Sequence, residues 1–103
     1  MIISEDSPIF ELERHSLLLE IIFILEEKGE INFQKFIDNY SMSSTTLYRT
    51  LGALKKLKIV GSKIDKSTYP KKTVLFLTEN GKSIAQKLKE IDEILRGDKH
   101  GKE

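Results

Sequence analysis

The chain has 103 residues, with 17 basic and 16 acidic side chains and no cysteine. This length predicts one domain, because a second core would be too small to be stable by itself. The missing cysteines exclude a disulfide framework and a thiolate zinc site, and a hydrophobic content of 39% excludes disorder of most of the chain.

The net charge of +1 conceals an uneven distribution of charge along the chain. Residues 1–39 carry three basic and nine acidic groups, a net charge of −6, whereas residues 74–103 carry six of each. Residues 40–73 carry eight basic groups and Asp65 as their one acidic group, a net charge of +7. A basic middle third indicates either a polyanionic partner or a solvated, lysine-rich surface.

The first predicted element is a helix from about residue 10 to residue 28, with Ser7 as its N-cap and Gly29 at its end. Its polar residues form one narrow stripe, and apolar residues within 17–25 cover most of the remaining surface. A helix that is apolar around most of its circumference has to be buried on several sides. We therefore expect a second copy of the chain to cover part of it.

Two shorter helices are predicted next. Ile31 predicts a short strand, and Asn32 is placed to cap a helix over residues 33–40, whose apolar residues recur at spacings of three and four. A polar turn at residues 41–43 leads to a third helix over residues 44–58, which carries a stripe of leucines.

The last third of the chain predicts a hairpin and a helix. Two β-type runs, residues 59–64 and 73–77, are joined by an exposed loop. Thr78 caps a final helix over residues 79–95, and residues 97–103 form a polar tail that we expect to be disordered.

This order of elements predicts an α+β fold that is mainly helical. Two short helices separated by a tight turn and followed by a β-hairpin are typical of a winged helix-turn-helix. The predicted domain spans residues 1–96 and has a three-helix core, a β-hairpin wing and an extra C-terminal helix.

The third helix and the hairpin loop carry the candidate DNA-binding residues. A helix that enters the major groove usually reads bases with its N-terminal residues; Arg can read guanine, and lysines contact phosphates. A basic hairpin beside such a helix can touch flanking phosphates or the minor groove. The same pattern also fits an ordinary exposed helix face and a solvated turn. The candidates are Ser43, Ser44, Thr45, Tyr48, Arg49, Lys55, Lys56, Lys63, Lys66, Lys71 and Lys72.

Gly52 lies on the same face of the third helix. A glycine within a helix costs about 1 kcal/mol relative to alanine. It allows either close approach to DNA or close packing against a neighbouring helix, and the sequence does not distinguish the two.

The final helix predicts a homodimer interface together with the first helix. Its apolar residues recur at intervals of four, three and four, which forms a seam of two heptads. The alternative is that this seam packs against the first helix within one monomer. The candidate interface residues are Leu18, Ile22, Leu25, Ile84, Leu88, Ile91 and Leu95.

Two runs of residues resemble those of small prokaryotic winged-helix regulators. Residues 44–60 are similar to a recognition helix and the first wing strand, and Leu77-Thr78-Glu79-Asn80-Gly81-Lys82 is similar to the leucine-threonine-x-x-glycine step of MarR- and PadR-like proteins. The resemblance covers residues 10–95 and implies a homodimeric, DNA-binding transcriptional regulator. Lys58 departs from it, because these proteins often carry glycine there, and the chain lacks the extra long helices of full-length MarR proteins.

The sequence predicts no enzyme, metal site or cofactor. His15 and His100 have no second ligand at metal spacing, and the chain has no glycine-rich phosphate loop or nucleophile motif. The longest apolar run is too short to span a membrane, and no leader opens the chain, so we expect a cytoplasmic protein.

The predicted function is sequence-specific binding of double-stranded DNA by a transcriptional regulator. Residues 44–58 would enter the major groove, and residues 63–73 would lie on the backbone or in the minor groove. The alternative is a winged-helix protein-interaction module without specific DNA binding, because a fold does not by itself determine a function. The sequence identifies no small-molecule effector.

Overall fold

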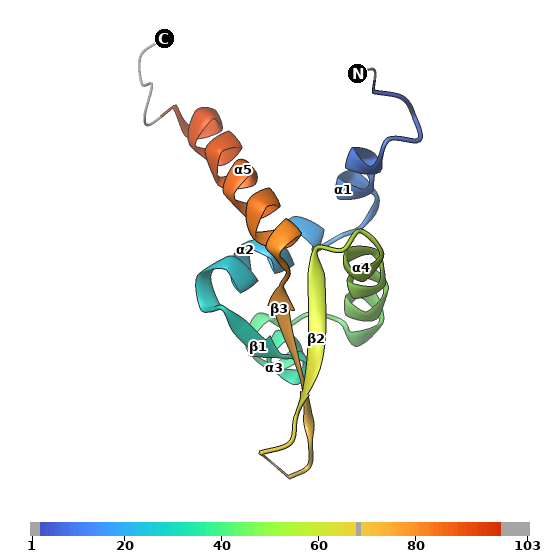
Figure 1. Ribbon diagram of the computed structural model, residues 1–103, viewed down its shortest axis with the longest axis vertical. Coiled ribbons are helices and arrows are strands. Elements are labelled where there is room, and N and C mark those ends of the chain that lie inside the picture. The colour runs from blue at the N-terminus through green and yellow to red at the C-terminus, as the bar shows by residue number, and fades with distance from the viewer. Residues whose placement is uncertain (1–2, 68, 98–103) are drawn as a thin grey trace.

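The computed structural model of the chain describes residues 3–67 and 69–97 (Figure 1). Its elements follow the predicted order and confirm a mainly helical winged-helix fold. His100 and most of the predicted tail, residues 98–103, lie outside the described residues. The elements are η1, a 3-10 helix (Pro8–Phe10), α1 (Glu11–Arg14), α2 (Leu18–Lys28), β1 (Glu30–Asn32), α3 (Phe33–Tyr40), α4 (Ser44–Lys56), β2 (Val60–Asp65), β3 (Lys72–Leu77) and α5 (Glu79–Arg96).

The three strands form one antiparallel sheet in the order β1-β3-β2. In the β2–β3 hairpin, Val60 lies opposite Leu77 and Asp65 lies opposite Lys72. The short β1 pairs only with the inner half of β3, because the chain leaves the strand at Asn32 to begin α3. The outer half of the hairpin is therefore a two-stranded wing that extends beyond the helices, at the lower end of Figure 1.

The core lies between the helices α2, α3 and α4 and one face of the sheet. Burial of an aliphatic or aromatic side chain contributes about 1.5–3 kcal/mol, so these residues supply most of the driving force for folding. The largest fully buried side chains are Phe36, Leu18, Ile21, Ile22, Leu25, Leu47, Leu54, Ile59, Leu75 and Thr50.

The prediction of one continuous first helix is wrong. The backbone leaves the helical region at His15, Leu17 adopts a left-handed φ of 70°, and α2 begins only at Leu18. At this break the buried Thr50 hydroxyl of α4 donates a hydrogen bond to the Ser16 carbonyl over 2.8 Å. The break directs η1 and α1 away from the body, so that they and α5 project as two separate arms (Figure 1).

The predicted role of α2 in a dimer interface is also corrected. Leu18, Ile22 and Leu25 are 1%, 0% and 1% exposed within the monomer, so their side chains are not available to a second copy. The sequence alone does not show which elements of the same chain cover α2. In the structure α2 also packs against β3 and α5, and these elements bury its apolar surface.

No helix in the described part of the chain is long and apolar enough to cross a membrane.

Candidate nucleic-acid interface

Helix α4 is held with one face in the core and the opposite face in solvent. Ser43 is its N-cap, and the Ser43 hydroxyl accepts a hydrogen bond from the Thr46 backbone N–H over 3.4 Å. Leu47, Leu51 and Leu54 are buried, as the leucine stripe predicts. Because these residues fix the rotation of the helix about its axis, they also determine which side chains face outward.

The outward arc of α4 contains the residues predicted for it. Its exposed members are Ser44, Thr45, Tyr48, Arg49, Gly52, Lys55 and Lys56. A Cβ at Gly52 would meet nothing within 4 Å, so the interpretation of Gly52 as a helix-packing residue is wrong. Within the part of the chain that the structure describes, the cations of this arc form no ion pair. They are therefore free to pair with an external anion.

The C-terminus of α4 ends in a Schellman motif with lysine at the left-handed position. Lys58 has φ 63°, the Ile59 N–H donates to the Leu54 carbonyl over 2.9 Å, and the Lys58 N–H donates to the Lys55 carbonyl over 3.0 Å. Glycine favours this conformation because it has no Cβ. Although Lys58 stands where similar proteins often carry glycine, the turn keeps the backbone conformation that glycine would adopt.

Thr78 and Gly81 attach the end of α4 to the start of α5. The Thr78 hydroxyl lies 2.6 Å from the Lys58 carbonyl oxygen, to which it donates, and it accepts from the Gly81 N–H over 2.9 Å. A Cβ on Gly81 would lie 2.1 Å from the Ile59 carbonyl oxygen, so only glycine fits. The leucine-threonine-x-x-glycine step therefore has a mechanical role, because it fixes α5 against the turn that ends the recognition helix.

The wing cations differ in their environment. The Lys63 ammonium is 2.8 Å from a Glu30 carboxylate oxygen and 5.9 Å from the centroid of the Phe76 ring, so Lys63 bridges the sheet from β2 to β1. Lys66, Lys71 and Lys72 are exposed and form no ion pair with any described residue. Of the four predicted wing cations, Lys63 is thus the one that forms an ion pair with a described residue.

The turn of the wing is shaped by Asp65. Its Oδ1 accepts hydrogen bonds from the Ser67 N–H over 3.0 Å and from the Ser67 hydroxyl over 2.6 Å. These bonds, assisted by the nearby Lys63 and Lys72 charges, lower the pKa of the Asp65 carboxyl below its usual value. Asp65, the only acidic residue of the wing, therefore stabilises the turn through these hydrogen bonds.

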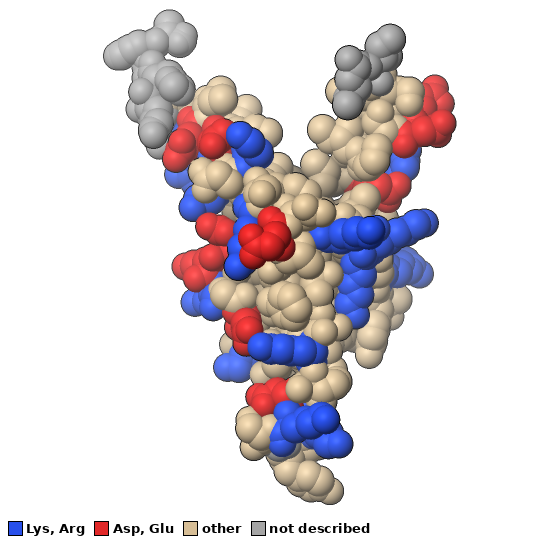
Figure 2. Space-filling view, viewed as in Figure 1, with Lys and Arg blue, Asp and Glu red and all other residues tan. Residues whose placement is uncertain are grey.

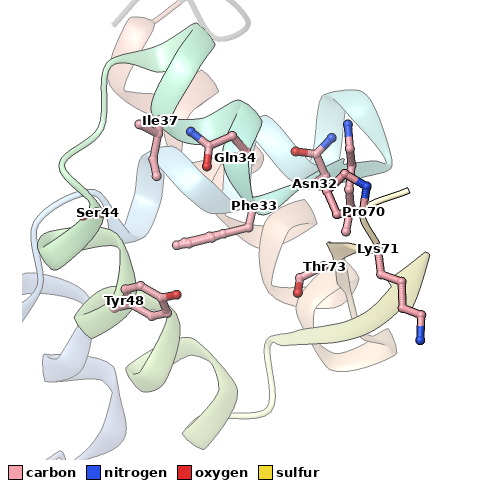
Figure 3. Close-up of a pocket in the computed structure, with 10 residues that line it drawn as sticks. Asn32, Phe33, Gln34, Ile37, Ser44, Tyr48, Pro70, Lys71 and Thr73 are labelled. Atoms are coloured by element: carbon pink, nitrogen blue, oxygen red, sulfur yellow. The ribbon is translucent and has the colours of Figure 1, made fainter. Parts of the chain in front are cut away.

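A groove of about 520 Å³ separates the helices from the wing (Figure 3). Phe33 from α3 and Tyr48 from α4 line it and contact one another, with ring centroids 4.8 Å apart and ring planes at 90°. The groove is lined by Asn32, Phe33, Gln34, Ile37, Ser44, Tyr48, Pro70, Lys71, Lys72 and Thr73.

The structure thus brings Ser44, Tyr48, Lys71 and Lys72 to one groove, and it places Lys55 and Lys56 farther along α4. The sequence prediction missed the groove residues of α3 and β3. The spacing of the apolar residues over 33–40 predicts a buried face that includes Phe33, and only the contact with Tyr48 reveals its second role. Figure 2 shows basic side chains over α4 and near the end of the wing, acidic ones over the N-terminal segment, and a mixture of both over α5.

A second, apolar groove of about 430 Å³ lies between the N-terminal segment and α5. Ile84 and Leu88 line it and are half-buried, whereas Ile91 and Leu95 are 51% and 80% exposed. Ile94, which the heptad pattern did not include, is 62% exposed. The second half of α5 therefore presents an apolar surface that the monomer leaves uncovered.

No group of His, Asp and Glu side chains among residues 3–67 and 69–97 could hold a metal ion. The His15 ring nitrogen Nε2 is 3.1 Å from the Glu11 carboxylate. Hydrogen bonds from Arg14 and His15 lower the pKa of the Glu11 carboxyl. This cluster joins side chains of α1 and His15 and belongs to the N-terminal arm.

Comparison with known proteins identifies relatives by sequence and by fold. The model of one protein family, the Mga helix-turn-helix domain, matches residues 5–72. No curated protein sequence matches the chain significantly.

Several solved structures share the fold. The reduced form of the transcriptional regulator YodB from B. subtilis has a TM-score of 0.77 and 21% identity, over 94% of each chain. A MarR-family transcriptional regulator from Porphyromonas gingivalis W83 has a TM-score of 0.70 and 22% identity, over 95% of each chain. A mutant MarR from E. coli, solved with operator DNA, has a TM-score of 0.70 and 15% identity, over 85% of this chain and 63% of that one. These likenesses confirm the predicted MarR-like winged-helix fold.

Proposed function

Because the chain belongs to the Mga helix-turn-helix domain family, we propose that it is a transcriptional regulator that binds specific sequences in double-stranded DNA. It acts in the cytoplasm and as a binding protein rather than an enzyme. The observation that carries this proposal is the position of the unpaired cations. Among the described residues, most of them lie on the solvent face of α4 and on the wing, the two elements that a winged helix presents to a duplex.

The residues of α4 make different contacts with DNA according to their position along the helix. Arg49 lies on the exposed arc within the first two turns, where a guanidinium can donate two hydrogen bonds to guanine. Lys55 and Lys56 lie in the last turn and suit phosphates that flank the major groove. Lys66, Lys71 and Lys72 on the wing contact the backbone or the adjacent minor groove.

Titration of a 30-base-pair duplex at two salt concentrations tests this function directly. Phosphate contacts release counterions, so affinity has to fall by orders of magnitude between about 50 and 200 mM salt if the cations of α4 and the wing bind DNA. Binding that does not change with salt, or the absence of binding, would favour the alternative of a protein-interaction module.

We also propose that the regulator is a homodimer, in which α5 and the N-terminal arm of each copy meet. The support is the uncovered apolar surface of α5 beside an apolar groove. A two-fold protein reads two half-sites about 34 Å apart, which raises specificity. Sedimentation equilibrium at tens of micromolar distinguishes a monomer of 11.8 kDa from a species of twice that mass.

A further inference from the structure

Tyr48 is held in place by the ring of Phe33. The two rings form the edge-to-face contact that aromatic pairs favour, with centroids 4.8 Å apart. Phe33 is the first residue of α3, whose start is fixed by the Asn32 cap, and Tyr48 lies in the second turn of α4. The contact between two separate helices restricts the Tyr48 side chain before any ligand binds.

The Tyr48 hydroxyl is not used by the protein. The side chain is 69% exposed, and no described residue forms a hydrogen bond with its hydroxyl. A hydrogen bond from the hydroxyl of an exposed tyrosine usually adds little to binding affinity, because ordering the side chain costs conformational entropy. Here the contact with Phe33 already restricts the Tyr48 side chain. A ligand that accepts a hydrogen bond from the hydroxyl therefore causes a smaller loss of conformational entropy.

The groove beside Tyr48 is suited to an anion. Every polar side chain that lines it carries a hydrogen-bond donor, and none carries a carboxylate. Lys71 and Lys72 contribute positive charge from the wing, and Ser44 adds a hydroxyl from α4 (Figure 3). The lining would stabilise a chain of phosphates and would offer little to a cation.

The position of the groove identifies which phosphates it would take. A recognition helix in the major groove and a wing in the adjacent minor groove are separated by one sugar-phosphate strand of the duplex. The groove occupies this position between α4 and the wing. We propose that it seats this strand, that the Tyr48 hydroxyl donates a hydrogen bond to a phosphate oxygen of it, and that Phe33 is the positioning residue. This inference rests on the proposed DNA binding.

The substitution Tyr48→Phe tests the hydrogen bond, because it removes the hydroxyl and keeps the ring pair. Two probes are needed: a duplex selected from a random pool by the wild-type protein, and a 30-base-pair duplex of mixed sequence. We expect about tenfold weaker binding to both, since a hydrogen bond to a charged oxygen contributes about an order of magnitude in affinity. The salt dependence stays unchanged, because tyrosine carries no charge that displaces counterions.

Tyr40→Phe is the matched control. Tyr40 is the last residue of α3 and packs on Phe36, outside the groove. It should leave the affinity for both probes unchanged.

A double-mutant cycle tests the positioning role of Phe33. Phe33→Leu should weaken DNA binding when Tyr48 is present and should have no further effect in Tyr48→Phe, whereas a general loss of structure would weaken both proteins equally. Phe33→Tyr keeps an aromatic ring and should restore most of the affinity. Equal effects of Phe33→Leu in both backgrounds would overturn the positioning role.

The outcomes separate this inference from the proposed function. A loss confined to the selected duplex would mean that Tyr48 reads a base and would overturn the phosphate contact. Wild-type affinity in Tyr48→Phe for both probes would also overturn it, while leaving DNA binding itself established. If the wild-type protein selects no duplex from the random pool and does not bind the mixed-sequence duplex at any salt concentration, the proposed function and this inference fail together.

Discussion

The Thr50 hydroxyl donates a hydrogen bond to the Ser16 carbonyl over 2.8 Å and connects the recognition helix to the break between α1 and α2. The two residues are 34 positions apart in the chain. Thr50 is 1% exposed, and it is the one buried polar side chain of the core in the described residues. The hydrogen bond therefore couples the orientation of α4 to that of the N-terminal arm.

Replacing Thr50 by valine should destabilise the fold by about 1–3 kcal/mol, because the shape is kept while the Ser16 carbonyl loses its partner. Urea unfolding monitored by circular dichroism measures this change. Thr46→Val, on the same helix, removes a hydroxyl that forms no hydrogen bond with any described residue, and it should change stability by less than about 0.5 kcal/mol. Similar losses for both variants would contradict the role of the hydrogen bond.

Lys58→Gly should stabilise the protein by about 0.5–1 kcal/mol. The left-handed conformation of Lys58, with φ 63°, costs a residue with a Cβ about 1–2 kcal/mol. Glycine removes this cost, and part of the resulting gain in stability is offset by the greater entropy of glycine in the unfolded chain. Lys56→Gly is the control of opposite sign, since it lies within α4 and should cost about 1 kcal/mol. Thermal unfolding of the two variants should therefore shift in opposite directions.

Gly81→Ala should destabilise the fold by about 3 kcal/mol or more, because the new methyl group would collide with the backbone carbonyl of Ile59. Gly52→Ala has open space and should stabilise α4 by about 1 kcal/mol. Denaturant midpoints measure both. If Gly52→Ala is more stable and yet binds DNA more weakly, Gly52 serves close approach to the duplex.

Arg49→Ala should cost about 1–3 kcal/mol in binding to a selected duplex and relax the preference at one base pair. Lys71→Ala should weaken binding to all sequences and reduce the salt slope by about one. Competition titrations with selected and mixed-sequence duplexes distinguish the two patterns. An Arg49→Ala protein with unchanged affinity and preference would remove Arg49 from base recognition.

Leu95→Lys should dissociate the proposed dimer without unfolding the monomer, because the side chain is 80% exposed and makes little contribution to the core. In a dimer the new charge would have to be desolvated at the interface. Sedimentation equilibrium reports the mass, and circular dichroism reports the fold. Gln86→Lys, at another exposed position of α5, is the control and should stay dimeric.

The order of the elements and most helix starts can be predicted from the sequence, because caps and helical periodicity depend on neighbours in the chain. Asn32, Ser43 and Thr78 were expected at or beside helix starts, and each accepts a hydrogen bond from the N–H three residues later. The leucine stripe of α4 likewise placed Arg49 and Tyr48 on the solvent face, since helical periodicity is a local property. The winged-helix order follows from these elements.

Features that depend on contacts between distant segments are visible only in the folded chain. The apolar residues of α2 predict burial by a second copy of the chain, but β3 and α5 bury them within the monomer. The sequence pattern of α2 does not indicate which elements pack against it. The left-handed Leu17 interrupts a helical pattern because the chain turns there, where Thr50 meets the freed carbonyl. The Glu30–Lys63 ion pair and the Phe33–Tyr48 ring pair also join separate elements, so the charge left on the wing and the restraint on Tyr48 emerge only when the chain is folded.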